Sequence, residues 1–131
     1  MKTKGETVHP GQSESDYLHI DPSDLLEAVG GDAGTVAALA RTFVDSAPDI
    51  FSRLEQAALA GNADATRHES HTLKGMCALF NARVLTALLL QTEQAGRQGH
   101  TPRPEELVQL QVSFGLVLDE IRRYAHAPMS A

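Results

Sequence analysis

The sequence predicts an all-α fold, an antiparallel up-and-down four-helix bundle preceded by one short extra N-terminal helix. Alanine and leucine are abundant, tryptophan is absent, and aromatic residues make up only 5% of the chain. This composition favours helices packed on helices over a β-sandwich, which is usually richer in valine, threonine and aromatic residues. The 131 residues, 42% of them apolar, are enough for one compact domain with its own core.

The first two expected helices lie in the N-terminal half of the chain. Asp21 and Pro22 are typical of a helix start, and Gly30 with Gly31 ends this short helix. In the longer helix that follows, apolar residues recur at steps of three and four. They are Val36, Ala40, Phe43, Ala47, Ile50, Leu54 and Ala57. The stripe keeps its phase through Pro48, which removes one backbone hydrogen bond, so we expect one kinked helix or two nearly continuous ones.

Three more helices complete the expected bundle. Gly61 ends the long helix, and the next helix spans about 62–80. Asn81, which tolerates the left-handed conformation and also caps helices well, separates it from a helix that ends near Gly96. A loop over 96–104 precedes a strongly amphipathic last helix. Because the connections are short, consecutive helices are expected to run antiparallel.

Charge and composition argue against several classes of partner. The formal net charge of −6 disfavours nucleic acid, whose phosphates are bound by an excess of lysine and arginine. No apolar run approaches the roughly 20 residues that span a bilayer, and the N-terminus lacks the apolar segment of a signal peptide. The one cysteine, Cys77, cannot form an internal disulfide, which fits a reducing compartment. We therefore expect a cytoplasmic protein with neither a nucleic-acid nor a membrane partner.

The two ends of the chain differ from its centre. Residues 1–16 and 127–131 are polar and lack helical periodicity, so we interpret them as flexible tails around a domain that spans 17–126. The starting Met1 and the N-terminal tail mildly favour a freestanding protein over a domain excised from a hybrid kinase.

The helix over 62–80 carries the candidate site. At about 100° per residue, its apolar side chains gather on one arc. This arc contains Leu73, Met76, Cys77 and Phe80. His71 points roughly 180° away, toward solvent, with Arg67, His68, Lys74 and Gly75 three or four residues from it on the same face. The cations would favour a dianionic group. Glycine inside a helix costs ~1 kcal/mol against alanine, and here it would leave room for a bulky group or a partner.

The run His71, Thr72, Leu73, Lys74, Gly75, followed by Asn81 and Ala82, closely resembles the H-x-L-K-G signature of histidine phosphotransfer (HPt) domains of bacterial phosphorelays. The likeness covers about residues 20–125. It implies that His71 accepts a phosphoryl group from the aspartate of a receiver domain and passes it to another receiver. It also implies that Lys74 neutralises the phosphoryl oxygens and that Gly75 gives the receiver clearance.

The same resemblance implies a phosphocarrier rather than an enzyme. The chain would bind no cofactor, because the Mg²⁺ ion and most of the catalysis come from the receiver. Its partners would be the receiver domains of a hybrid sensor kinase and of a response regulator, met by a monomer. The expected docking surface comprises Arg67, His68, Lys74, Gly75, Ala78 and Arg83.

Three departures from the family pattern stand out. Asn81 replaces the usual glycine, Met76 and Cys77 stand where small residues are common, and Glu69 falls on the apolar arc. An unpaired buried carboxylate is costly, so we expect Glu69 near a boundary or paired with a cation. Cys77 is interpreted as a small buried hydrophobe.

Two other functions remain open at this point. A helical scaffold or inhibitor module could bind a kinase or receiver without accepting phosphate, although it would not need a helix-weakening glycine beside His71. The phospho-accepting portion of a chemotaxis-type kinase is the second alternative. His68 and His71 lie three apart, but no third or fourth metal ligand is identifiable in the sequence, so metal binding is not expected.

Overall fold

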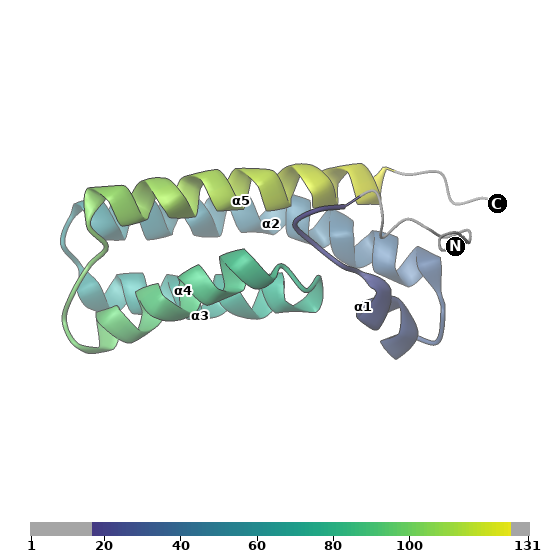
Figure 1. The fold of residues 1–131 in the computed structure, drawn as a ribbon, viewed down its shortest axis with the longest axis horizontal. Coiled ribbons are helices and arrows are strands. Elements are labelled where there is room, and N and C mark those ends of the chain that lie inside the picture. The colour runs from purple at the N-terminus through teal and green to yellow at the C-terminus, as the bar shows by residue number, and fades with distance from the viewer. Residues whose placement is uncertain (1–16, 127–131) are drawn as a thin grey trace, which may run out of the picture.

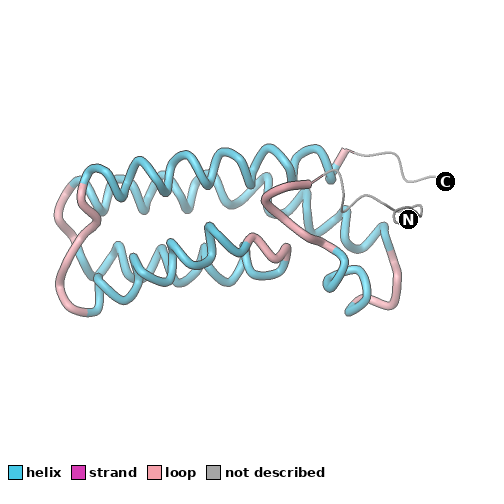
Figure 2. The backbone as a smooth tube through the Cα atoms, in the orientation of Figure 1, coloured by secondary structure: helices cyan, strands magenta, loops and turns pink. Residues whose placement is uncertain are grey.

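The computed structural model describes residues 17–126, which form five α-helices. These are α1 (Ser23–Ala28), α2 (Ala33–Leu59), α3 (Ala63–Leu79), α4 (Arg83–Arg97) and α5 (Pro104–Ala125). The four long helices lie side by side, α2 with α5 and α3 with α4, and α1 lies at one end of them (Figure 1). Within residues 17–126 Figure 2 shows helices and loops but no strand, so the all-helical prediction is confirmed. The predicted tails, 1–16 and 127–131, lie outside the described residues.

The turns between helices use residues that suit them. Gly61 and Asn81 follow the ends of α2 and α3 with φ angles of 70° and 53°, the left-handed conformation that commonly ends a helix. Asn62 caps α3 by accepting a hydrogen bond from the backbone N–H of Ala65. Asn81, by contrast, does not cap α4, because Ala82 occupies that position.

The first helix starts one residue later than the sequence predicts. Pro22 is its N-cap, and the Asp21 carboxylate accepts a hydrogen bond from the backbone N–H of Ser23 at 3.1 Å. α2, in contrast, continues through Pro48 as one helix, which is one of the two expected alternatives. The stripe predicted on either side of Pro48 faces the core throughout, because both parts keep one phase.

The core joins all the long helices. Phe43 of α2 meets Phe80 edge-on at 5.9 Å, and Phe51 stacks on Phe114 of α5 at 4.4 Å. In α4 the fully buried side chains include Leu85, whereas its neighbour Val84 is exposed. No helix in the described part of the chain is long and apolar enough to cross a membrane.

α3 and α4 pack very closely where the start of α3 meets the end of α4. A Cβ atom added to Gly96 would lie 2.8 Å from the backbone oxygen of Ala63 and 2.9 Å from the Cβ of Arg67. Real Cβ atoms do not come so close, so glycine is needed where the two helices approach. This approach sets the distance between the α3 and α4 side chains that form the candidate site.

Candidate functional site

His71 lies on the outward face of α3, as the helical periodicity predicts. Its side chain is 63% exposed, whereas Leu73 and Cys77 on the opposite face are fully buried. The ring is therefore accessible to a partner, while the opposite face of α3 packs into the bundle.

A buried carboxylate on α4 holds the inner side of this ring. Glu93 Oε2 lies 2.9 Å from His71 Nδ1, and only 2% of the Glu93 side chain is exposed. The same carboxylate forms ion pairs with Lys74 Nζ at 2.7 Å and with Arg97 Nη2 at 2.8 Å. Three nitrogen-bearing side chains thus converge on Glu93, and two of them come from α3.

These contacts determine the charge of Glu93 and the tautomer of His71. Hydrogen bonds from Lys74, then His71 and Arg97, lower the pKa of Glu93 to about 2, although burial acts in the opposite direction. An ionised carboxylate only accepts hydrogen bonds, so Nδ1 of His71 carries the proton. In the neutral ring, Nε2 then holds the free lone pair and is the nucleophilic atom.

Sequence reasoning missed both Glu93 and Arg97. Glu93 follows Leu85 and Leu89 at intervals of four, so it occupies a core position of an amphipathic helix. A carboxylate in a buried stripe is a signal for a special role, because it needs a partner. Arg97 lies one further turn along α4 and supplies one of those partners.

The residues that the sequence places around His71 separate into two groups. Lys74 contacts the Glu93 carboxylate directly, and a Cβ at Gly75 would meet no atom within 4 Å. Arg67 instead pairs with Asp64 at 3.0 Å and lies against Gly96, while His68 is exposed. Within residues 17–126, no side-chain hydrogen bond or ion pair joins Arg67 or His68 to His71 or Glu93.

An open groove adjoins the site between α3 and α4. Its volume is about 320 Å³. The residues that line it are Lys74, Ala78, Asn81, Arg83, Thr86, Ala87 and Leu90. Lys74 belongs to both the groove and the Glu93 cluster, so the groove begins where the cluster ends. Ala78 and Arg83, expected in the docking surface, are thus both part of its wall.

The departures from the family pattern have different structural reasons. Glu69 is 16% exposed and pairs with Arg53 of α2 at 3.2 Å, so its expected boundary position and cationic partner are confirmed. Cys77 is fully buried, as expected, and burial raises the pKa of its thiol to about 12. Met76 is half-buried against the core. Asn81 donates hydrogen bonds to residues of the N-terminal segment.

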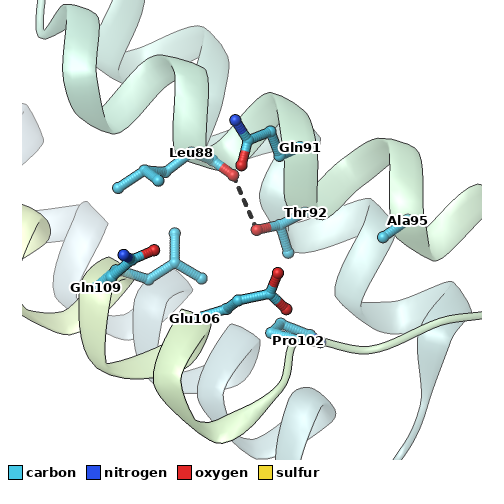
Figure 3. A pocket seen from close by; sticks show the side chains of 8 residues that line it. Leu88, Gln91, Thr92, Ala95, Pro102, Glu106 and Gln109 are labelled. Atoms are coloured by element: carbon cyan, nitrogen blue, oxygen red, sulfur yellow. Dashed lines mark hydrogen bonds between the residues drawn. The ribbon is translucent and has the colours of Figure 1, made fainter.

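A second cavity lies between α4 and α5 (Figure 3), and none of the residues that line it belongs to the His71–Glu93 cluster. Its volume is about 50 Å³, which suits water rather than a substrate. Two of its polar side chains already have partners, since Thr92 donates to the Leu88 carbonyl and Glu106 accepts from the Arg103 N–H. Across residues 17–126, no three histidine, cysteine or acidic side chains are grouped so that they could hold a metal ion.

Comparison with known proteins identifies the family and the fold. The sequence profile of the Hpt domain matches residues 38–127, well over half of the chain. The fold is similar to the crystal structure of histidine-containing phosphotransfer protein B (HptB) from Pseudomonas aeruginosa PAO1. The TM-score is 0.74 at 25% sequence identity, over 84% of this chain and 96% of that chain. A search of curated protein sequences gave no match. The chain therefore belongs to the Hpt domain family and is a histidine phosphotransfer protein of phosphorelay signalling.

Proposed function

We propose that His71 is the phosphoryl acceptor and that Nε2 is the atom that carries the phosphoryl group. The observation that supports this most strongly is the 2.9 Å hydrogen bond between His71 Nδ1 and the buried Glu93 carboxylate. It keeps the proton on Nδ1 and leaves the Nε2 lone pair free on a side chain that is 63% exposed.

The transfer needs no proton to move. The Nε2 lone pair attacks the phosphorus of a receiver's aspartyl phosphate in line, the P–Nε2 bond forms, and the P–O bond to the aspartate breaks. The ring gains a positive charge while Nδ1 keeps its proton, and the ionised Glu93 stabilises that charge. In the forward relay, a carboxylate of a second receiver attacks the same phosphorus and the P–Nε2 bond breaks.

Lys74 and Arg97 are proposed to neutralise the phosphoryl oxygens. Both cations reach Glu93 in the free protein, and their side chains are 24% and 61% exposed. Rotation of a long flexible side chain can bring its charge to a new anion nearby at little cost. Arg97 is thus an addition to the residues that the family signature implies.

We assign the Mg²⁺ ion and most of the catalysis to the receiver, so that this chain acts as a carrier. The donor set at His71 fits this division, because Glu93 is the carboxylate at the site and already binds His71, Lys74 and Arg97. Such a cluster offers a divalent metal ion no free carboxylate ligand.

The docking surface is proposed to be the outward face of α3 around Gly75 together with the adjoining groove, including Ala78 and Arg83. The partners are the receiver domain of a hybrid sensor kinase and that of a response regulator. A monomer suffices for the reaction, because His71, Lys74, Glu93 and Arg97 all belong to one chain. We place the relay in the cytoplasm, where the buried free thiol of Cys77 would stay reduced.

Phosphotransfer from a labelled receiver tests the acceptor. Receiver domains of the source organism, charged with labelled acetyl phosphate and Mg²⁺, are mixed one by one with the wild type, His71→Gln and His68→Gln. We expect label on the wild type and on His68→Gln, the matched control from the same exposed face, and none on His71→Gln. Equal labelling of His71→Gln would show that another residue is the acceptor. Full signalling by that variant in cells would favour the scaffold function instead.

A further inference from the structure

Residues 17–22, here called the N-terminal strap, cross the end of the bundle between α5 and the turn that joins α3 to α4 (Figure 1). Glu120 of α5, whose side chain is 5% exposed, anchors one part of the strap. Its carboxylate accepts hydrogen bonds from three successive backbone N–H groups. The donors are Leu18 at 2.9 Å, His19 at 2.8 Å and Ile20 at 3.1 Å.

The other part of the strap is bound to the α3–α4 turn. The backbone N–H of Asp21 donates to the carbonyl of Phe80 at 2.8 Å. The side-chain amide of Asn81 donates to the Asp21 carbonyl at 3.3 Å and to the Asp24 carboxylate at 3.0 Å. The turn is therefore connected through the strap to α5, although none of these residues touches His71 in any contact that the structure shows.

Asn81 is suited to this contact in a way that the family's usual glycine is not. Its φ angle of 53° lies in the left-handed region, which asparagine tolerates better than most residues other than glycine. Glycine would adopt the same backbone conformation but has no amide to donate. The departure that the sequence shows at position 81 thus adds two hydrogen bonds to the turn.

The turn that these bonds hold forms a wall of the groove beside the candidate site. Asn81 itself lines the groove together with Ala78 and Arg83, and Lys74 lines its opposite end toward His71. Fixing the amide of Asn81 on the strap therefore fixes the position of this wall relative to the outward face of α3.

We propose that Asn81 is a positioning residue for receiver docking. By joining the strap to the α3–α4 turn, it keeps the groove beside His71 in the shape on which a receiver domain docks. This proposal rests on the proposed function, but it concerns docking and not the chemical step. A substitution at Asn81 leaves Glu93 and its two cationic partners, Lys74 and Arg97, in place.

The variant Asn81→Gly keeps the left-handed backbone and removes both side-chain hydrogen bonds. The measurement uses the receiver domain that labels the wild type most rapidly. We expect the receiver concentration at half-maximal transfer to rise about fivefold to tenfold. This rise corresponds to a loss of docking free energy similar to the contribution of about one hydrogen bond. The transfer rate at saturating receiver should stay unchanged. Asn62→Gly is the matched control, because Asn62 caps α3 through Ala65 at the other end of the bundle and does not touch the strap.

A paired substitution separates this contact from a general loss of stability. Asn81→Asp places a carboxylate against Asp24 and should raise the half-maximal concentration further, and adding Asp24→Asn restores a donor opposite an acceptor and should reverse part of that rise. Hydrogen exchange of the Asp21 amide should accelerate in Asn81→Gly and not in Asn62→Gly.

An unchanged half-maximal concentration in Asn81→Gly would overturn the proposal, as would a loss of saturating rate without a change in that concentration. Calorimetric binding of the unphosphorylated receiver domain reads docking without any transfer. If the wild type bound the receiver but took no label, the proposed function would fail while the role of Asn81 in docking could still be measured.

Discussion

Glu93 of α4 and Glu120 of α5 are two buried carboxylates with different kinds of partner. Their side chains are 2% and 5% exposed, and each occupies a position on the core side of an amphipathic helix. Glu93 is satisfied by the side chains of His71, Lys74 and Arg97. Glu120 is satisfied by three backbone N–H groups of the N-terminal strap, with Arg123 at 4.0 Å.

The difference between these partners separates the proposed reactive cluster at Glu93 from an anchor at Glu120. Backbone N–H groups are fixed by the chain, so the bonds to Glu120 hold the strap in one place. Long cationic side chains can rotate, and Lys74 and Arg97 are proposed to turn from Glu93 to an arriving phosphoryl group. Burial of a carboxylate is costly in both places unless partners satisfy it, and the chemistry proposed at Glu93 depends on partners that can move.

The largest expected effect comes from removing the Glu93 carboxylate. In Glu93→Ala the ring loses the acceptor that holds its proton on Nδ1, and the charge that develops on the ring is no longer stabilised. We expect the phosphotransfer rate at saturating receiver to fall about 100-fold. Glu93→Gln, which keeps an acceptor without the charge, should lose only about tenfold. Rapid-quench kinetics with labelled receiver measures both.

The opposite outcome would change the role assigned to Glu93. If Glu93→Ala transferred phosphoryl groups at the wild-type rate, Glu93 would be an anchor like Glu120, and the His71 hydrogen bond would have no part in the reaction. ¹⁵N chemical shifts of the His71 ring provide an independent check, because the variant should lose the preference for the Nδ1–H tautomer.

Glu120→Ala should instead affect stability. It leaves three backbone N–H groups of the strap without their acceptor, at about 1 kcal/mol each, so the free energy of unfolding should fall by about 3 kcal/mol. Urea denaturation measures this loss. The transfer rate at saturating receiver should remain that of the wild type, because Glu120 contacts no residue of the His71 cluster. A variant of unchanged stability that transferred poorly would reverse the roles assigned to the two carboxylates.

The sequence predicted the part of the site that depends on one helix. The periodicity of α3 placed His71 in solvent opposite Leu73 and Cys77, and the H-x-L-K-G motif supplied the expected reaction. The helical spacing also placed Arg67 on the same face as His71, whereas the structure pairs Arg67 with Asp64. Side chains one turn apart share a face, but each turns toward the charge that it can reach.

The contacts that the sequence did not reveal join distant segments. Glu93 is 22 residues from His71, and Glu120 is 100 residues from Ile20. A carboxylate on an apolar stripe signals that a partner is needed, but its identity depends on which helices become neighbours. Glu69 illustrates the same limit, since its need for a cation was predicted and Arg53 was identified only in the fold.

The smallest expected effects concern two glycines, Gly96 in the packed contact between α3 and α4 and Gly75 on the open face beside His71. A Cβ at Gly96 would lie 2.8 Å from the backbone oxygen of Ala63, so Gly96→Ala should destabilise the bundle by about 1–3 kcal/mol as α3 and α4 move apart. A Cβ at Gly75 would meet nothing within 4 Å, so Gly75→Ala should stabilise the free protein by up to ~1 kcal/mol. Thermal and urea denaturation of both variants measure these opposite signs.

Gly75→Ala is the more telling of the pair, because its benefit to the free protein should be accompanied by a loss in the complex. If the open space beside His71 is reserved for a receiver, the added methyl group should raise the receiver concentration at half-maximal transfer while the free protein becomes more stable. The site would then trade helix stability for access, which no packing requirement inside the free chain explains. A stabilised Gly75→Ala variant that docks as well as the wild type would show instead that the glycine is merely tolerated. The docking face would then be set by the groove and its Asn81 wall alone.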